Sequence, residues 1–192
     1  LYPAVSGVVR NLTKALAHFD ATRLGPEAVA QLKTGIGALE QLAAKRVLIR
    51  STNISGAEST AYFIQTIDAL LDIGVGVSHL AKDAAVANGM SCYLSFLQAK
   101  EQTGIERAVM ATVFSADKFA GDAFIRFNQA MAAQKTFLQV FDDFASPEQK
   151  QFYAEKGRGS AVDLVAKMRQ TAGEKSGEGS FGITSSAWFD AI

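Results

Sequence analysis

Apolar side chains recur along most of the chain at the three- and four-residue spacing typical of an amphipathic helix. In residues 4–20, Val5, Val8, Leu12 and Leu16 share one such face. The same spacing predicts further helices over residues 26–50, 55–82, 83–115, 122–144 and 160–171, with a short helix beginning at Ser146-Pro147. No hairpin signal and no short internal repeat is present. We therefore predict an all-α fold, an elongated antiparallel bundle of long helices, with residues 1–192 forming a single domain.

Three of these helix starts carry polar residues that favour capping. Ser55 stands three residues before Glu58, and Ser146 stands three residues before Gln149, which is the spacing of a capping box. Asp122 precedes the apolar pattern that ends at Phe144, and aspartate is a favoured N-cap residue. The sequence therefore predicts where these helices begin as well as which face they bury.

The helix predicted over residues 83–115 is apolar around most of its circumference. Its wholly polar side is narrow and consists of Gln98, Gln102 and Glu106. On a helical projection Lys100, Gly104 and Arg107 form a stripe, and Glu101 lies among apolar side chains. A helix of this kind is expected at the centre of its domain, so we predict that Lys100, Glu101 and Arg107 face the interior.

Charges inside a protein must be paired, because an unpaired buried charge costs several kcal/mol. Two interpretations fit the stripe. Lys100, Glu101 and Arg107 could pair with one another or with other helices as architecture, or they could surround a bound ligand. Gly104 has two corresponding interpretations, since a missing side chain leaves room either for a ligand or for the close approach of a neighbouring helix.

Composition narrows the classes of function. Hydrophobic residues make up 48% of the 192 residues, and 19 basic residues balance 19 acidic ones, so nucleic-acid binding has no electrostatic support. The longest apolar segment, residues 61–80, is interrupted by Asp68 and Asp72, so no membrane span is expected in it. The chain begins with Leu1 and ends soon after a new apolar pattern starts, which suggests a piece excised from a longer protein.

The chemistry of an enzyme or a metal site is not visible in the sequence. Neither His18 nor His79 has a glutamate three residues before it, so no di-iron motif can be written. Cys92 lies among apolar residues and is interpreted as a small core residue. No nucleophile has a positioned base. We expect a non-enzymatic protein with no cofactor and no metal.

Residues 100–108 carry the most specific pattern in the chain. They read Lys100-Glu101-Gln102-Thr103-Gly104-Ile105-Glu106-Arg107-Ala108, which resembles the second signature, Lys-Glu-x-x-Gly-x-Glu-Arg-Ala, of the nitrate- and nitrite-sensing domain called NIT. Weaker similarities extend over residues 5–192, including Arg46 with the turn and helix that follow it. The family's first signature, Gln-x-Glu-Arg-Gly, has no counterpart in this chain.

The resemblance implies a ligand-binding sensor domain of a bacterial signal-transduction protein. In such a domain nitrate is held between an arginine of the first signature and the arginine of the second, which is Arg107 here. Lys100 and Gly104 share its stripe, and Glu101 is expected to orient a cation rather than to meet the anion. Arg46 and Arg50 are candidates for a second positive group.

The resemblance also implies partners and a location. We expect a small anion as ligand, an output module in the same chain to receive the conformational change, and a homodimer. The excised appearance of the chain favours the extracytoplasmic, periplasmic part of an inner-membrane receptor, with a cytoplasmic protein as the alternative. Two other functions stay open: a NIT-like sensor retuned to another small ligand, and a structural or dimerisation bundle.

Overall fold

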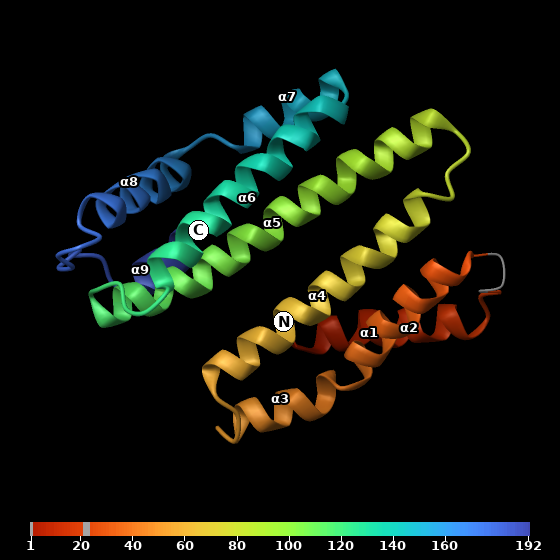
Figure 1. Cartoon of the computed structure of the whole chain (residues 1–192), viewed down its shortest axis with the longest axis horizontal. Helices are drawn as coiled ribbons and strands as arrows, with labels where there is room; N and C mark the ends of the chain where they lie inside the picture. The colour runs from red at the N-terminus through yellow and green to blue at the C-terminus, as the bar shows by residue number, and fades with distance from the viewer. Residues whose placement is uncertain (1, 21–23) are drawn as a thin grey trace. The chain divides into compact units, whose positions relative to one another are not determined.

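The computed structural model describes residues 2–20 and 24–192, and within them the chain forms nine α-helices and no strand (Figure 1). The all-α prediction is confirmed. The helices are α1 (Tyr2–Ala17), α2 (Pro26–Glu40), α3 (Leu42–Arg50), α4 (Gly56–Ser78), α5 (Ala84–Ala116), α6 (Ala123–Phe144), α7 (Pro147–Lys156), α8 (Ser160–Glu174) and α9 (Ser185–Ala191).

The chain divides into two compact units, residues 1–87 and 88–192. The first contains α1 to α4, and the second contains α6 to α9 with all but the first turn of α5. The sequence-based assignment of residues 1–192 to one domain stays a prediction.

All three helices with predicted capping residues begin where the sequence predicts, and the predicted capping hydrogen bonds form at two of them. The Ser55 hydroxyl accepts a hydrogen bond from the Glu58 backbone N–H, while the Glu58 carboxylate accepts one from the Ser55 N–H, so the predicted capping box is confirmed. Ser146 and Gln149 form the same arrangement at α7. Helix α6 begins after Asp122 as predicted, but the Asp122 side chain makes no capping hydrogen bond.

One predicted helix is in fact two. The apolar pattern suggested continuity from residue 26 to residue 50, whereas α2 and α3 are separated at Gln41. The backbone of Gln41 keeps right-handed helical angles, φ −77° and ψ −12°. The prediction was wrong because the interruption contains neither glycine nor proline, which are the residues that mark breaks in a sequence.

In the first unit, α2 and α4 pack closely at two glycines. A Cβ atom at Gly35 would lie 2.7 Å from Ile73 Cδ1, and one at Gly76 would collide with the Gln31 side chain. The Tyr62 hydroxyl adds a hydrogen bond of 2.7 Å to the Ala38 carbonyl. Small residues therefore let these two helices approach each other.

Helix α4 is also the one helix in the described part of the chain that is long and apolar enough to cross a membrane. Its length and composition meet these criteria even with Asp68 and Asp72 in the segment. A core helix of a soluble protein meets the same criteria, so the finding by itself does not place α4 in a membrane.

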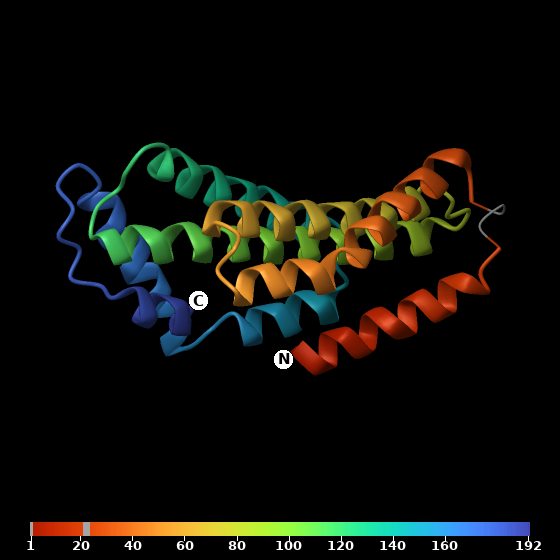
Figure 2. The same ribbon diagram turned by 90° about the horizontal axis from the view of Figure 1, so that it is seen from below.

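The second unit has a hydrophobic core built around the C-terminal half of α5, which runs beside α6 in both views (Figures 1 and 2). The core also receives side chains from α8, α9 and the segment between them. Its buried members are Val109, Met110, Val113, Phe114, Phe127, Val165, Met168, Ala172, Phe181 and Trp188. Helix α5 is thus central to its unit, as its apolar composition indicates.

The turn after α5 holds the segment that leads to α9. The Asp117 carbonyl accepts a hydrogen bond from the Ser180 N–H at 3.1 Å, and its carboxylate accepts one from the Phe181 N–H at 2.9 Å. Gly179 lies directly against this turn with φ +72°, and a Cβ atom there would be 2.4 Å from the Asp117 carbonyl oxygen. Only glycine fits this position without strain.

Gly179→Ala should therefore destabilise the protein by about 2 kcal/mol or more, because it combines an unfavourable φ with a steric overlap. Urea unfolding followed by circular dichroism measures the change. Gly177→Ala is the matched control, because a Cβ atom there meets nothing within 4 Å and φ is not in the left-handed region. Equal stability of the two variants would contradict the prediction.

Candidate functional site

The stripe of Lys100, Gly104 and Arg107 lies along α5 and is open above the glycine. A Cβ atom at Gly104 would meet only one neighbouring atom, the Glu101 carboxylate oxygen Oε2, at 4.0 Å. Of the two interpretations of Gly104, close approach of another helix is therefore not supported in the described part of the chain. The glycine leaves free space with a cationic residue one turn away on either side.

Arg107 makes two contacts with helix α9. Its guanidinium carbon lies 4.6 Å from the centre of the Phe189 ring, a cation–π contact. Its backbone carbonyl accepts a hydrogen bond of 3.0 Å from the indole N–H of Trp188. The residue is half-buried, so its guanidinium is held on one side and still reaches the surface.

The buried face of α5 differs from the predicted one. Lys100 is exposed, so the prediction that it faces the interior is wrong, while Glu101 and Arg107 are half-buried. Glu106, which the projection placed on the polar side, is completely buried. Glu106 is buried because it lies on the most buried line of α5. Small side chains let this line pack closely against the core, and its other members are Cys92, Ser95, Ala99, Met110 and Val113.

Glu106 is paired with an arginine from α8. Arg169 Nε donates to Glu106 Oε1 at 2.6 Å, and Arg169 Nη2 donates to Glu106 Oε2 at 2.5 Å, which is a bidentate ion pair. Arg169 Nη2 also donates to Gln134 Oε1 at 3.2 Å, and Gln134 Nε2 donates to the Thr103 hydroxyl. The network joins α5, α6 and α8.

Sequence reasoning missed this network. Glu106 was visible as part of the residue 100–108 motif but looked like a solvent-facing residue, and Arg169 lies 63 residues away in sequence. The available signal was on α8, where the buried residues Val165, Met168 and Ala172 place Arg169 beside the helix face that enters the core.

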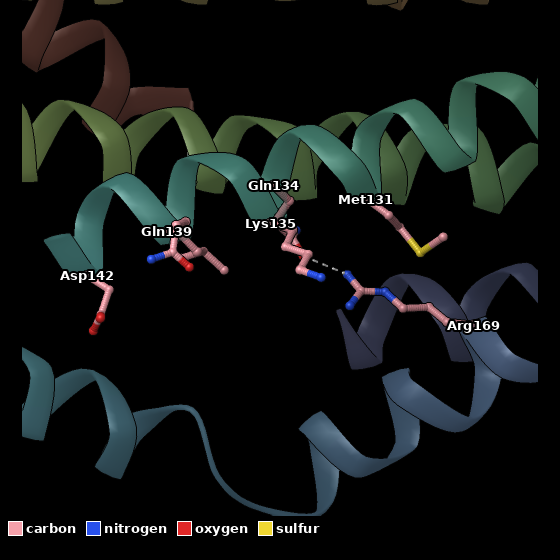
Figure 3. Close-up of a pocket in the computed structure, with 7 residues that line it drawn as sticks. Met131, Gln134, Lys135, Gln139, Asp142 and Arg169 are labelled. Carbon is pink, nitrogen blue, oxygen red and sulfur yellow. Dashed lines mark hydrogen bonds between the residues drawn. The ribbon is translucent and has the colours of Figure 1, made fainter.

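A pocket of about 390 Å³ lies between α6 and α8 (Figure 3). Its lining is Met131, Gln134, Lys135, Leu138, Gln139, Asp142 and Arg169. Figure 3 shows Arg169 pointing across the pocket toward Gln134, to which it is hydrogen bonded. The pocket contains none of the predicted ligand residues, and Glu106 already balances the charge of Arg169.

The other two predicted site residues lie on α3 in the first unit. Arg46 is half-buried, and its Nη1 donates a hydrogen bond of 2.9 Å to the Ser6 hydroxyl on α1. Arg50 is exposed in the last turn of α3. The structure thus groups Lys100, Glu101, Gly104 and Arg107 on one helix and gives Arg46 a contact within its own unit. A ligand role for Arg46 and Arg50 stays a prediction.

Residues 2–20 and 24–192 contain no group of three or more histidine, cysteine, aspartate or glutamate side chains placed to hold a metal. Cys92 is buried, as expected of a core residue, and burial raises the pKa of its thiol. A thiol with a raised pKa is a poor nucleophile at neutral pH.

An all-helical fold whose central helix carries the motif of residues 100–108 is that of a sensor domain of signalling proteins. The chain belongs to the NIT family, described as nitrate and nitrite sensing, whose match covers residues 3–192. It is 29% identical over 153 residues to the nitrate regulatory protein of Klebsiella oxytoca, a stretch that covers 80% of this chain and 38% of that relative. The chain therefore spans well under half the length of the curated relative it matches. No solved structure gives a significant match.

Breaking the Glu106–Arg169 pair should cost about 3 kcal/mol of unfolding free energy, because Glu106→Ala leaves the arginine without its partner and opens a cavity. The double variant Glu106→Met with Arg169→Met should recover most of this loss. Denaturant unfolding of the wild-type protein, Glu106→Ala and the double variant measures the change in unfolding free energy.

The matched control is the surface pair between Asp142 and Lys150, whose side chains are 60% and 43% exposed. Asp142→Ala should cost less than about 1 kcal/mol because solvent screens exposed ion pairs. If Glu106→Ala lost as little unfolding free energy as Asp142→Ala, the buried pair would not stabilise the unit.

Proposed function

We propose that this domain binds nitrate or nitrite at the Lys100–Gly104–Arg107 stripe of α5, with Arg107 as the main ligand. The observation that carries the proposal is the geometry of Arg107. Its guanidinium lies over the ring of Phe189, and Arg107 stands one helical turn from the open space above Gly104, within the motif that resembles the family's second signature.

The chemistry of the two partners is complementary. Nitrate is a planar anion with three acceptor oxygens, and a guanidinium is a planar fork of donors, so the two can form a bidentate pair. Lys100 adds a second positive charge along the stripe, and Gly104 lets a small ligand approach the helix backbone.

Glu101 limits the strength of the site. Its carboxylate lies beside Gly104 and reduces the charge of the stripe to a net single positive charge.

The size of nitrate sets a second limit. A ligand of four heavy atoms gains at most about 1.5 kcal/mol per atom, so the affinity is limited to about 6 kcal/mol, or tens of micromolar. This range suits a sensor that responds to a nutrient.

Signal transmission is part of the proposal. The anion favours one packing of the helices over another because it neutralises positive charge at a fixed position. The recipient is an output module in the same chain, acting within a homodimer. We place the domain in the extracytoplasmic part of an inner-membrane receptor, with the cytoplasm as the alternative. A reporter fused to the full-length protein distinguishes the two compartments.

The stack on Phe189 also favours a second candidate, in which Arg107 is architectural. In that case the domain is a structural or dimerisation bundle, and replacing Arg107 lowers stability without changing any response to anions. A sensor retuned to another small ligand differs from both, because it would respond to that ligand and not to nitrate.

Nitrate and nitrite at millimolar concentration should raise the melting temperature of the protein, and calorimetry should give a dissociation constant for nitrate near tens of micromolar. Arg107→Ala should abolish both effects, since the bidentate donor is lost. Arg126→Ala is the control, because Arg126 is an exposed arginine on α6 outside the stripe. Chloride serves as the control anion. Absence of heat and of a thermal shift in the wild-type protein would refute the proposal.

Glu101→Gln should strengthen nitrate binding about 3- to 10-fold, because it removes a negative charge beside the ligand while preserving the shape of the side chain. Calorimetric titration at low ionic strength measures the change, and added salt should reduce the difference. Glu178→Gln, an exposed glutamate far along the chain, should leave the affinity unchanged. Weaker binding in Glu101→Gln would mean that Glu101 holds a cation in place.

A further inference from the structure

Helix α9 is attached to the proposed ligand residue at two points. We infer that Trp188 and Phe189 are positioning residues that hold Arg107 for the anion and thereby couple α9 to ligand binding. The inference rests on the proposed function of Arg107, and it assigns a role to two residues that the sequence analysis did not include in the site.

Trp188 is the fixed attachment. Its side chain is fully buried and packs edge to face against Phe114, with ring centres 5.5 Å apart. Its indole N–H donates to the Arg107 carbonyl at 3.0 Å, across 81 residues of sequence. A buried indole with a satisfied N–H makes a rigid anchor, so α9 is tied to the backbone of α5 at residue 107.

Phe189 is the adjustable attachment. Its side chain is 51% exposed, and the Arg107 guanidinium lies over its ring with the central carbon 4.6 Å from the ring centre. Stacking occupies one face of a guanidinium and leaves the N–H groups at its edge available for hydrogen bonds. The edge is also where a planar oxyanion forms its bidentate pair.

The stack has two effects on an anion at Arg107. It restricts the rotamers of a long side chain before the ligand arrives, so less entropy is lost on binding. It also excludes water from one face of the ion pair, which strengthens the electrostatic attraction. Conversely, an anion that fixes the guanidinium should hold Phe189 and α9 more firmly.

The segment before α9 supports this coupling. Asp117 holds the backbone of Ser180 and Phe181, and the Thr184 hydroxyl caps α9 by accepting a hydrogen bond from the Ala187 N–H at 3.1 Å. These hydrogen bonds therefore position helix α9 without the ligand. The contact between Phe189 and Arg107 is the point at which ligand binding can change the position of α9.

The experiment compares the full chain with Phe189→Leu and Phe189→Tyr. Calorimetric nitrate titration should show about fivefold weaker binding for Phe189→Leu and a change of less than twofold for Phe189→Tyr, which keeps the ring. Because Phe189 is half exposed, both variants should fold. Phe152→Leu is the matched control, since it removes a comparable exposed contact, with Lys156 at 5.6 Å, on helix α7.

A second readout uses Trp188, the only tryptophan in the chain. Nitrate should change its fluorescence emission in the wild-type protein, and this change should be lost in Phe189→Leu at saturating nitrate. Arg107→Lys at the same nitrate concentrations corrects for direct quenching, because its backbone carbonyl still accepts the indole N–H.

The outcomes separate the two proposals. If the wild-type protein shows no nitrate heat, the proposed function fails, and this inference fails with it. If nitrate binds the wild-type protein, but Phe189→Leu keeps full affinity and the full Trp188 response, the inference alone is overturned. Weaker binding that Phe189→Tyr restores, together with loss of the Trp188 response in Phe189→Leu, supports it.

Discussion

A carboxylate that is completely shielded from water is the constraint on which the second unit depends. Glu106 lies on the central helix with no access to solvent, and a buried charge without a partner would cost several kcal/mol. Arg169 satisfies both carboxylate oxygens, and for this α8 must lie with one face against α5. The position of α8 in turn sets where the following segment begins, and that segment is held at Ser180 and Phe181 by Asp117 before it reaches the capped start of α9 and Trp188.

Glu106 and Arg107 are neighbours on α5 and have different roles. One position along a helix is a rotation of about 100°, so Glu106 points into the core while Arg107 points along the side toward α9. The ion pair inside the core fixes the position of α8, and in the described part of the chain Arg107 is contacted at its backbone carbonyl by Trp188 and at its guanidinium by Phe189. The motif of residues 100–108 thus combines one residue of a structural ion pair, Glu106, with the arginine to which we assign the ligand.

Periodicity and capping residues were enough to predict the class of fold and most helix limits, because these properties depend on local sequence. The break at Gln41 was not predictable in this way, since its cause is not a local breaker residue. The orientation of α5 was misjudged for a related reason. Hydrophobicity alone ranks Leu94 and Leu97 above Ser95 and Ala99, yet close packing brings the small residues innermost and takes Glu106 with them. Arg169 could not be paired with Glu106 from the sequence, because that contact joins two helices 63 residues apart.

The bond from Trp188 ends on a main-chain carbonyl, and this has an evolutionary consequence. Every amino acid offers the same carbonyl, so the anchor of α9 does not depend on which side chain stands at residue 107. Under the proposed role of Arg107, a descendant of this domain can exchange the arginine, and with it the ligand that the domain binds, while the packing around it persists. Divergence of ligand within a constant helical scaffold is what such an arrangement permits.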